Sequence, residues 1–377
     1  MELSISKKSF LRGLARTHAV ADRKSSMPIL SNILLTAEGT GTLALAATDL
    51  YLGVSATADA KVKKGGSVAV SARTLFDIVK ALPEGEVQWT VGENQAAEIR
   101  CGKVRYKIPG MPGEDFPPLP NPGKVDFADL DAELLGDLIN HTSYAMSSDD
   151  TRPHLAGALF EGDGKVVRMV TTDGHRLCKA EAKLDKGPML NFGMLVPNKG
   201  IAELKRMIED AKSDRGKDDG PLTVGVATTG GNAFFRREGI QLSVKLADEQ
   251  FPPYAKVIPQ QQNRRMVIGR TQLTEALKRI SLVASDKSGG VRLGLEAGLL
   301  RITSENPDVG EGSEELEVDF AGDPVVIGFN ARYLLDVLGS LASDQVALEL
   351  SGELDPGVVR PVSESIDFIG VIMPMRI

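Results

Sequence analysis

The chain has 377 residues, which predicts two to four domains, and its 42% hydrophobic and 25% charged residues are typical of a soluble globular protein. The two separated cysteines, Cys101 and Cys178, exclude a disulfide framework and a cysteine zinc site, and the net charge of −7 argues against indiscriminate nucleic-acid binding. Because no apolar run approaches a membrane span and the N-terminus has no signal-peptide pattern, we expect a cytoplasmic protein with no membrane partner.

Six amphipathic helices are predicted along the chain. Apolar residues recur at helical spacing, with polar residues on the opposite face, over 6–18, 71–82, 131–146, 197–212, 270–283 and 330–342. Short apolar or alternating runs separate them and predict strands, for example VVRMVTT at 166–172 and VALEL at 346–350. Many short strands with a few helices indicate an α+β fold.

One strand, polar cap and helix pattern occurs three times. In each copy a basic residue precedes an acidic residue by four positions, in the pairs Arg73 and Asp77, Lys199 and Glu203, and Arg332 and Asp336. Residues 27–35 likewise resemble 152–160, and the proline-rich stretch 115–120 resembles 250–254. We therefore predict three repeats of about 125 residues, rather than a coincidental likeness within a generic multidomain protein. The predicted domains are 1–120, 127–250 and 260–377, with extended connectors near 112–126 and 250–260.

Positive charge is concentrated on the predicted helices. Together the six helices carry a net charge of +5, so that the rest of the chain carries −12 of the total of −7. Helix 131–146 departs from this trend because it is acidic. If the helices line one surface, that surface attracts phosphate while the remainder repels it. The alternative is that each charged helix face is simply solvated.

Two further segments are candidates for chemistry. Asp173 and His175 could form a metal site or a base and its orienting acid, as in a hydrolase or nuclease, although the sequence has no established catalytic motif around them. The chain ends in MPMRI at 373–377, which is unusually apolar. This segment is either the end of a core strand or an adaptable methionine-rich surface for peptide ligands.

These features together resemble the bacterial DNA sliding clamps, the beta subunits of DNA polymerase III, over essentially the whole chain. The resemblance is carried by the MPIL, N and LL residues of 27–35, TDGHRL at 172–177, FPPY and VIP within 251–259, GFN and YLLDVL within 328–338, and MPMRI at 373–377. It implies a head-to-tail homodimer in which two chains of three clamp domains form a six-domain ring. Helices would line the inner face of the ring and antiparallel sheets would form the outside.

The resemblance also implies a pocket for partner peptides. Its residues would be Leu155, Thr172, Gly174, His175, Arg176, Leu177, Pro252, Lys256, Val257, Asn330, Tyr333, Met373, Pro374, Met375, Arg376 and Ile377. Lys256 stands where the family often has arginine, and Ile377 stands where leucine is often found. In this interpretation His175 is part of a pocket wall and the chain is not an enzyme.

Two more sets of residues follow from the resemblance and the helix faces. DNA binding is assigned to Arg23 and Lys24 by the resemblance and to Arg12, Arg16, Arg73, Lys80, Lys199, Arg206, Lys278 and Arg279 by the helices. The subunit interface would pair Tyr106 and Ile108 with Leu282 and Val283.

Expected partners are double-stranded DNA without sequence preference, the catalytic subunit of DNA polymerase III, the clamp loader, other DNA polymerases, and mismatch-repair and ligase-type proteins that carry short linear motifs. No cofactor or metal is expected, and the protein is expected in the cytoplasm near the nucleoid. The alternatives are a peptide-binding module without a DNA function and the hydrolase described above.

Overall fold

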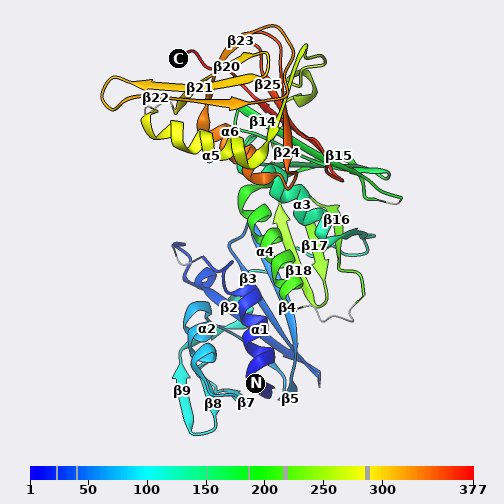
Figure 1. Ribbon diagram of the computed structural model, residues 1–377. Coiled ribbons are helices and arrows are strands. Elements are labelled where there is room, and N and C mark those ends of the chain that lie inside the picture. The colour runs from blue at the N-terminus through cyan, green and yellow to red at the C-terminus, as the bar shows by residue number, and fades with distance from the viewer. Residues whose placement is uncertain (23, 40, 150, 186, 215–219, 285–288) are drawn as a thin grey trace. The chain divides into compact units, whose positions relative to one another are not determined.

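The computed structural model describes residues 1–377 except 23, 40, 150, 186, 215–219 and 285–288 (Figure 1). It confirms the six helices, which are α1 (Lys7–Thr17), α2 (Ala72–Ala81), α3 (Ala132–Thr142), α4 (Asn198–Asp214), α5 (Arg270–Ile280) and α6 (Ala331–Ser340). The predicted third and fifth helices continue into the 3-10 turns η3 (Ser143–Ala145) and η5 (Ser281–Val283). Within the described part of the chain, no helix is both long and apolar enough to cross a membrane.

Polar side chains begin several of these helices. The hydroxyl of Ser6 accepts a hydrogen bond from the Ser9 amide at 3.1 Å, and the hydroxyl of Ser71 accepts one from the Thr74 amide at 3.4 Å. At α6, Asn330 Oδ1 accepts from the Arg332 amide at 2.9 Å. Each cap satisfies an amide that has no partner within the helix, which explains why these helices begin where the sequence places a serine or an asparagine.

The element order confirms the threefold repeat. Each repeat contains a strand, a helix, four or five strands, a second helix and three strands. The first repeat has β1 (Glu2–Ser6), β2 (Asn32–Glu38), β3 (Thr42–Thr48), β4 (Leu52–Asp59), β5 (Lys61–Lys64), β6 (Gly66–Ser71), β7 (Glu86–Val91), β8 (Ala97–Cys101) and β9 (Val104–Ile108), followed by β10 (Gly110–Pro112). The second has β11 (Ala128–Asp131), β12 (Gly157–Asp163), β13 (Val166–Thr172), β14 (Arg176–Lys183), β15 (Met189–Pro197), β16 (Thr223–Thr229), β17 (Asn232–Arg237) and β18 (Ile240–Lys245). The third has β19 (Arg264–Gly269), β20 (Gly290–Glu296), β21 (Leu299–Asn306), β22 (Gly310–Glu317), β23 (Val325–Asn330), β24 (Gln345–Leu350), β25 (Gly357–Pro361) and β26 (Asp367–Ile372).

The repeats do not coincide with the compact units of the chain. One unit contains residues 1–132 and 202–246, and the other contains 133–201 and 247–377. The second repeat is divided because its last three strands pair in the first unit, whereas β12 to β15 pair in the second. Hydrogen-bonded sheets thus join one repeat to the next.

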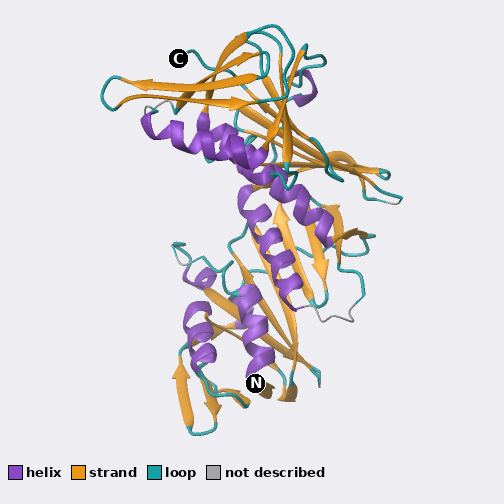
Figure 2. Ribbon diagram, in the orientation of Figure 1, coloured by secondary structure: helices purple, strands orange, loops and turns teal. Residues whose placement is uncertain are grey.

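In the first unit, a nine-stranded sheet has the order β10-β6-β2-β3-β4-β18-β17-β16-β11, and a five-stranded sheet has the order β5-β1-β7-β8-β9. Helices α1 and α2 lie side by side against these strands (Figures 1 and 2). Their apolar faces, with Phe10, Leu14, Leu75 and Val79, are fully buried against a core that includes Trp89. The helical spacing of these residues explains the burial.

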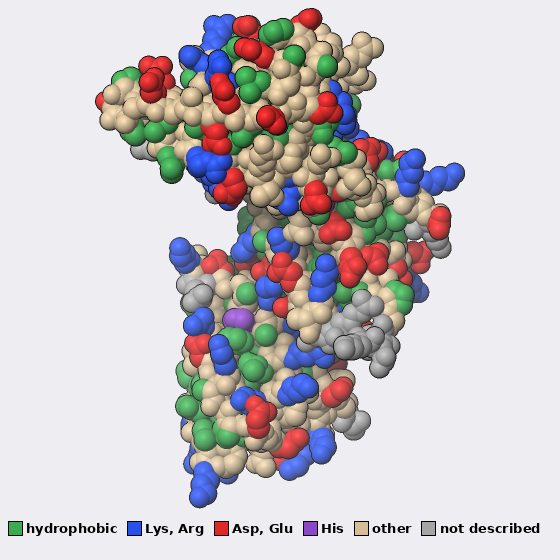
Figure 3. All heavy atoms as spheres, in the orientation of Figure 1, with side chains coloured by type: hydrophobic (Ala, Val, Ile, Leu, Met, Phe, Trp, Pro, Cys, Tyr) green, Lys and Arg blue, Asp and Glu red, His purple; other side chains and the backbone are tan. Residues whose placement is uncertain are grey.

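In the second unit, an eight-stranded sheet has the order β15-β12-β13-β14-β26-β25-β24-β19, and a four-stranded sheet has the order β22-β21-β20-β23. Strands β14 and β26 pair antiparallel, with Leu177 opposite Val371, and this pair joins the second repeat to the third. Basic and acidic side chains are interspersed on the face that Figure 3 shows. The β14–β26 pair is central to the candidate site.

Candidate functional site

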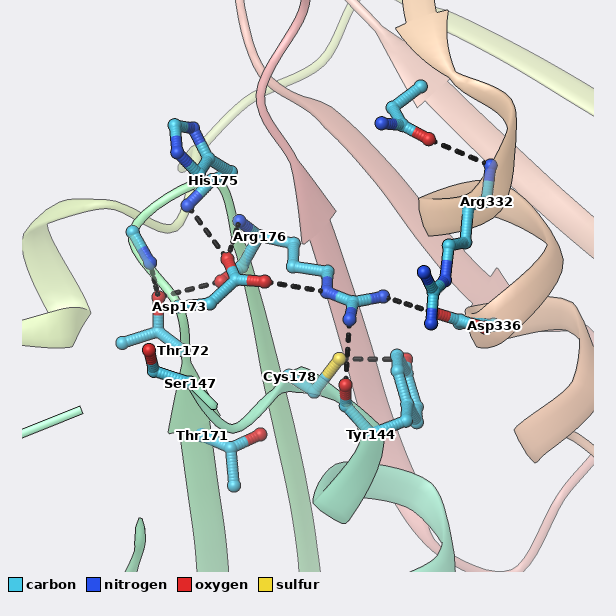
Figure 4. A network of polar contacts seen from close by, with 12 residues as sticks. Tyr144, Ser147, Thr171, Thr172, Asp173, His175, Arg176, Cys178, Arg332 and Asp336 are labelled. Carbon is cyan, nitrogen blue, oxygen red and sulfur yellow. Dashed lines mark hydrogen bonds and ion pairs between the residues drawn. The ribbon is translucent and has the colours of Figure 1, made fainter. Parts of the chain in front are cut away.

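A tight turn connects β13 to β14 and forms one edge of the candidate site (Figure 4). Thr172 Oγ1 donates to the Arg176 carbonyl at 2.6 Å and accepts from the Gly174 amide at 3.1 Å. Asp173 Oδ1 accepts from the backbone amides of His175 and Arg176 at 2.9 and 3.1 Å. Gly174 adopts φ +93°, where a side chain would strain the backbone. The side chains of Thr172 and Asp173 thus close the turn of TDGHR by accepting from three of its amides.

An apolar cavity of about 190 Å³ opens beside this turn. Its walls come from three stretches of the chain and consist of His154, Leu155, Thr172, Gly174, Arg176, Leu177, Pro252, Tyr254, Val257, Val371 and Met373. The side chains of Leu155, Leu177 and Val371 are buried, whereas Val257 and Met373 are 44% and 39% exposed. A concave apolar surface with a few polar groups at its rim suits an apolar peptide side chain.

The cavity rests on a packed core. Leu177 and Val371 form a cluster with Val170, Leu195 and Phe251, and all five side chains are at least nine-tenths buried. Tyr254 packs its ring edge against Phe251, and its hydroxyl donates to Glu161 Oε2 at 2.8 Å. The connector between the second and third repeats is therefore fixed in place, and the cavity is preformed.

Among the described residues that line the cavity, Arg176 is the one Lys, Arg, Asp or Glu, and three groups hold its guanidinium (Figure 4). Its Nε donates to Asp173 Oδ2 at 3.0 Å, its Nη1 to Asp336 Oδ2 at 2.6 Å, and its Nη2 to the Tyr144 carbonyl at 2.7 Å. Its guanidinium carbon lies 4.5 Å from the ring centre of Tyr333. Two carboxylates and a stacked ring thus hold the cation in one orientation.

Cys178 lies beneath this network, with its Sγ 2.7 Å from the Tyr144 hydroxyl. Burial raises the pKa of the Cys178 thiol to about 12, and burial also raises the pKa of the Tyr144 hydroxyl well above its ordinary value. Both groups are therefore neutral at physiological pH. Because the thiolate is the nucleophilic form, we expect the buried, neutral thiol of Cys178 to be unreactive.

We expect both cysteines, which are buried and free, to resist a disulfide reagent such as DTNB in the folded protein at pH 8. Two thiols per chain should react once the protein is unfolded in guanidinium. The measurement is the absorbance of released thionitrobenzoate with and without denaturant. Rapid labelling of Cys178 in the native protein would contradict the neutral, inaccessible thiol.

The terminal segment leaves the cavity after Met373. The Met373 amide donates to the His175 carbonyl at 2.9 Å, and the Met375 amide donates to the Gly328 carbonyl at 2.9 Å. Ile377 packs over Gly290 and Gly328, where an added Cβ would lie 3.0 and 2.8 Å from its side chain. The segment therefore contributes one wall residue and then lies along the strands of the third repeat.

The structure brings together half of the residues predicted for the pocket. Those that line the cavity are Leu155, Thr172, Gly174, Arg176, Leu177, Pro252, Val257 and Met373, and those that do not are His175, Lys256, Asn330, Tyr333, Pro374, Met375, Arg376 and Ile377. Tyr333 contacts the wall residue Arg176, and Asn330 caps α6. The wall also contains His154, Tyr254 and Val371, which the sequence did not single out. His154 and Tyr254 lie within two positions of predicted residues, and Val371 becomes apparent only from its pairing with Leu177.

The basic residues predicted for DNA, other than Arg16, fall into four groups. Arg12, Lys24, Lys80 and Lys199 are exposed. Arg73, Lys278 and Arg279 are also exposed, and each pairs with a neighbouring acid, namely Asp77, Glu275 and Glu314. Arg206 donates to the carbonyls of Ala15 and Arg16 at 2.7 and 3.1 Å and pairs with Glu203. Arg23 lies outside the described residues.

The assignment of Arg16 to DNA needs correction because its side chain is buried. Arg206 of α4 binds the carbonyls at the end of α1, where Arg16 lies, so this part of the helix is a packed junction.

The residues expected at the subunit interface differ in their exposure to solvent. Leu282 is 79% exposed and Tyr106 is 39% exposed, whereas Ile108 is buried in the core of the first unit.

The acid and histidine considered as a catalytic pair are not arranged as one. Asp173 uses its two carboxylate oxygens for the His175 and Arg176 amides and for the Arg176 guanidinium. Among the described residues, no group of three His, Cys, Asp or Glu side chains could hold a metal ion. The polar network around Asp173 is thus organised to hold a turn and an arginine.

Known proteins match the chain over its full length. Residues 1–120, 129–253 and 255–376 match the family models of the N-terminal, central and C-terminal domains of the DNA polymerase III beta subunit. The chain is 34% identical to the beta sliding clamp of Caulobacter vibrioides over 384 aligned residues, with both chains fully covered. The crystal structure of DNA polymerase III subunit beta from Pseudomonas aeruginosa matches at a TM-score of 0.92 and 32% identity, with full coverage of both chains. A sliding clamp from Bartonella birtlesii bound to griselimycin matches equally, at a TM-score of 0.92 and 31% identity over the full length of both chains. The chain therefore belongs to the DNA polymerase III beta subunit family, the beta sliding clamps.

Proposed function

We propose that two copies of this chain form a closed ring around duplex DNA and tether the replicative polymerase to it. The observation that carries the proposal is the threefold repeat of one domain, matched from end to end by the clamp family. The family is a non-enzymatic processivity factor, so the mechanism is topological: a closed ring does not leave a long duplex without opening. Replication places this function in the cytoplasm, and we propose an association with the nucleoid.

Two sheet edges support a head-to-tail closure between copies. Strand β9 has a paired neighbour only in β8, and β22 only in β21, among the residues that the structure describes. The β9 edge carries Arg105 and Lys107, whereas β22 carries Glu311, Glu314, Glu315 and Glu317. Unpaired edges of opposite charge favour pairing with each other, and a heterologous contact that closes by rotation gives a ring. We propose that Tyr106 and Ile108 near one edge meet Leu282 and Val283 of the second copy.

The proposed DNA contacts are the exposed basic residues of the helices and Lys24. Arg12, Lys80 and Lys199 are exposed, whereas Arg16 and Arg206 take part in packing. Long cationic side chains at a helix surface suit phosphates and carry no sequence information. This pattern favours weak, sequence-independent contacts along a duplex that the ring already encloses.

The apolar cavity is the proposed site for partner peptides. Its preformed apolar walls fit short motifs rich in Leu and Phe, and Met373 adapts to different ligands. The proposed partners are the catalytic subunit of DNA polymerase III, the clamp loader, other DNA polymerases, and mismatch-repair and ligase-type proteins. A solved relative bound to griselimycin supports a ligand-binding role for this family.

The ring proposal is tested by retention on DNA of different topology. Lys80→Glu with Lys199→Glu should weaken retention on short linear duplexes by roughly tenfold at about 0.1 M salt, because phosphate contacts are lost. Retention on closed circles should change much less, because the ring stays linked. The measurement is gel filtration of loaded clamp on circular DNA before and after linearisation.

A matched control is Lys61→Glu with Lys165→Glu, which makes the same change in charge at exposed lysines outside the helices. This control should behave like the wild-type protein. Equal loss from circles and from linear DNA would contradict the topological mechanism. Equal behaviour of the two double variants would contradict the assignment of the helix lysines.

A further inference from the structure

The first repeat contains the same turn as the candidate site, without its arginine. Thr48 Oγ1 donates to the Leu52 carbonyl at 2.6 Å and accepts from the Leu50 amide at 3.0 Å. Asp49 Oδ1 accepts from the amides of Tyr51 and Leu52 at 2.9 and 2.6 Å. Leu50 even adopts φ +76°, in the position that Gly174 holds at +93°. The two turns share every one of these hydrogen bonds, and Leu52 stands where the second repeat has Arg176.

The turn of the first repeat forms without an arginine. A buried leucine completes the turn of the first repeat, which keeps its aspartate as Asp49, so the turn does not need a guanidinium. Arg176 therefore contributes something other than the backbone geometry. Since it lies in the wall of the apolar cavity, its contribution concerns the surface that a ligand meets.

The acid that reaches Arg176 from outside the turn is Asp336 of α6 (Figure 4). Glu203 is its counterpart in the second repeat, since each follows the basic residue of its repeat by four positions. Glu203 pairs with Arg206 at 2.5 Å, and Arg206 donates to the carbonyls at the end of α1. Asp336 instead pairs with an arginine that also donates to the Tyr144 carbonyl, just beyond α3. The same helix position thus supports a helix junction in one repeat and the cavity wall in the other.

We infer that Asp336 is a positioning residue of the peptide site, which acts through Arg176 to keep one cavity wall in place. The inference rests on the proposed binding of partner peptides in the apolar cavity. With Asp336 present, each nitrogen of the Arg176 guanidinium has a partner, and the group presents its stem and flat face rather than a free cation. Without Asp336, the guanidinium loses the contact from α6 and gains freedom to turn toward the cavity.

The primary test is Asp336→Asn in the full-length dimer, with Glu203→Gln as the matched control at the equivalent position. The probe is a fluorescein-labelled peptide that carries a Leu- and Phe-rich clamp motif, measured by fluorescence anisotropy. Loss of a charge-assisted hydrogen bond should weaken peptide binding of the Asp336 variant by about tenfold. The Glu203 variant should bind the peptide as the wild-type protein does. Asp336→Glu, which keeps the charge, should recover part of the affinity.

A double-mutant cycle distinguishes positioning from general destabilisation. In an Arg176→Leu background, which copies Leu52 of the first repeat, Asp336→Asn should cause no further loss of peptide affinity. Unchanged affinity in Asp336→Asn, an equal loss in Glu203→Gln, or an undiminished loss in the Arg176→Leu background would each overturn the inference while the wild-type protein still binds. Absence of peptide binding by the wild-type protein would overturn the proposed function, and the inference with it.

Discussion

Replacing Leu282 with aspartate should convert the proposed dimer into monomers. Leu282 lies in η5, directly after α5, and the residue is 79% exposed in the single chain. Burial of a leucine at an interface is worth roughly 1.5–3 kcal/mol, and a carboxylate buried there without a partner costs several kcal/mol more. A head-to-tail ring has two identical interfaces, so the substitution acts twice. Sedimentation velocity at low micromolar concentration should show the 40.3 kDa chain rather than twice that mass.

The matched control is Leu354→Asp, at another exposed leucine of the same unit, 64% exposed and located between β24 and β25. This variant should remain dimeric. A dimer that survives Leu282→Asp, with its circular dichroism unchanged, would refute the interface. Ile108 is a poorer probe, because it is only 8% exposed and belongs to the core of the first unit. An aspartate there would destabilise the fold as well as any interface.

The same sedimentation experiment separates the proposed ring from a free-standing peptide-binding module. A free-standing peptide-binding module predicts a wild-type mass near 40.3 kDa, whereas the ring predicts twice that mass. A hydrolase predicts DNA cleavage that a chelator abolishes, and Asp173 is already committed to the turn and to Arg176. The wild-type mass measured beside Leu282→Asp therefore tests the ring against the module, and a DNA cleavage assay with and without a chelator tests the hydrolase.

Local patterns in the sequence were sufficient to predict the helices and the repeat. Helix boundaries follow from apolar spacing and from caps such as Ser6, which are interactions within a few residues. The arrangement of the sheets was not predictable in this way. Strands β4 and β18 pair through Leu242 and Val54, and nothing local in either strand identifies the other. The division of the second repeat between two units follows from such long-range pairs.

The candidate site shows the same division between local and long-range information. The segment TDGHRL was identified by its resemblance to the clamp family, and its turn is closed by hydrogen bonds between neighbours in the chain. Val371 was not predicted, and it lines the cavity because its strand pairs with that of Leu177. Ile377 was predicted to line the pocket, but it packs on Gly290 and Gly328 instead. Arg16 was predicted to be exposed because a helical wheel contains no information about Arg206, which binds the end of the same helix. Residue type was thus a good guide to the chemistry and a weaker guide to which side chains meet.

Deletion of residues 373–377 should strongly weaken partner binding while the proposed ring persists. Met373 is one wall of the apolar cavity, and its amide is the donor that ties the segment to His175. Loss of this wall should weaken binding of a clamp-motif peptide by roughly 100-fold, from the apolar contact that a methionine side chain supplies. Leu282 and the β9 edge make none of the contacts described for this segment, so dimer mass should be unchanged. Anisotropy with the labelled peptide and sedimentation of the same sample measure both properties.

A shorter deletion, of Arg376 and Ile377 alone, is the informative control. It removes the packing of Ile377 over Gly290 and Gly328 but leaves Met373 and the Met375 amide, which donates to Gly328, in place. Because neither deleted residue lines the cavity, this variant should keep most of its peptide affinity. Wild-type affinity after the longer deletion would refute the cavity as the partner site. Equal losses in both variants would show that Ile377 anchors the segment and that the wall depends on that anchor, and loss of the dimer would show that the segment supports the fold of the third repeat itself.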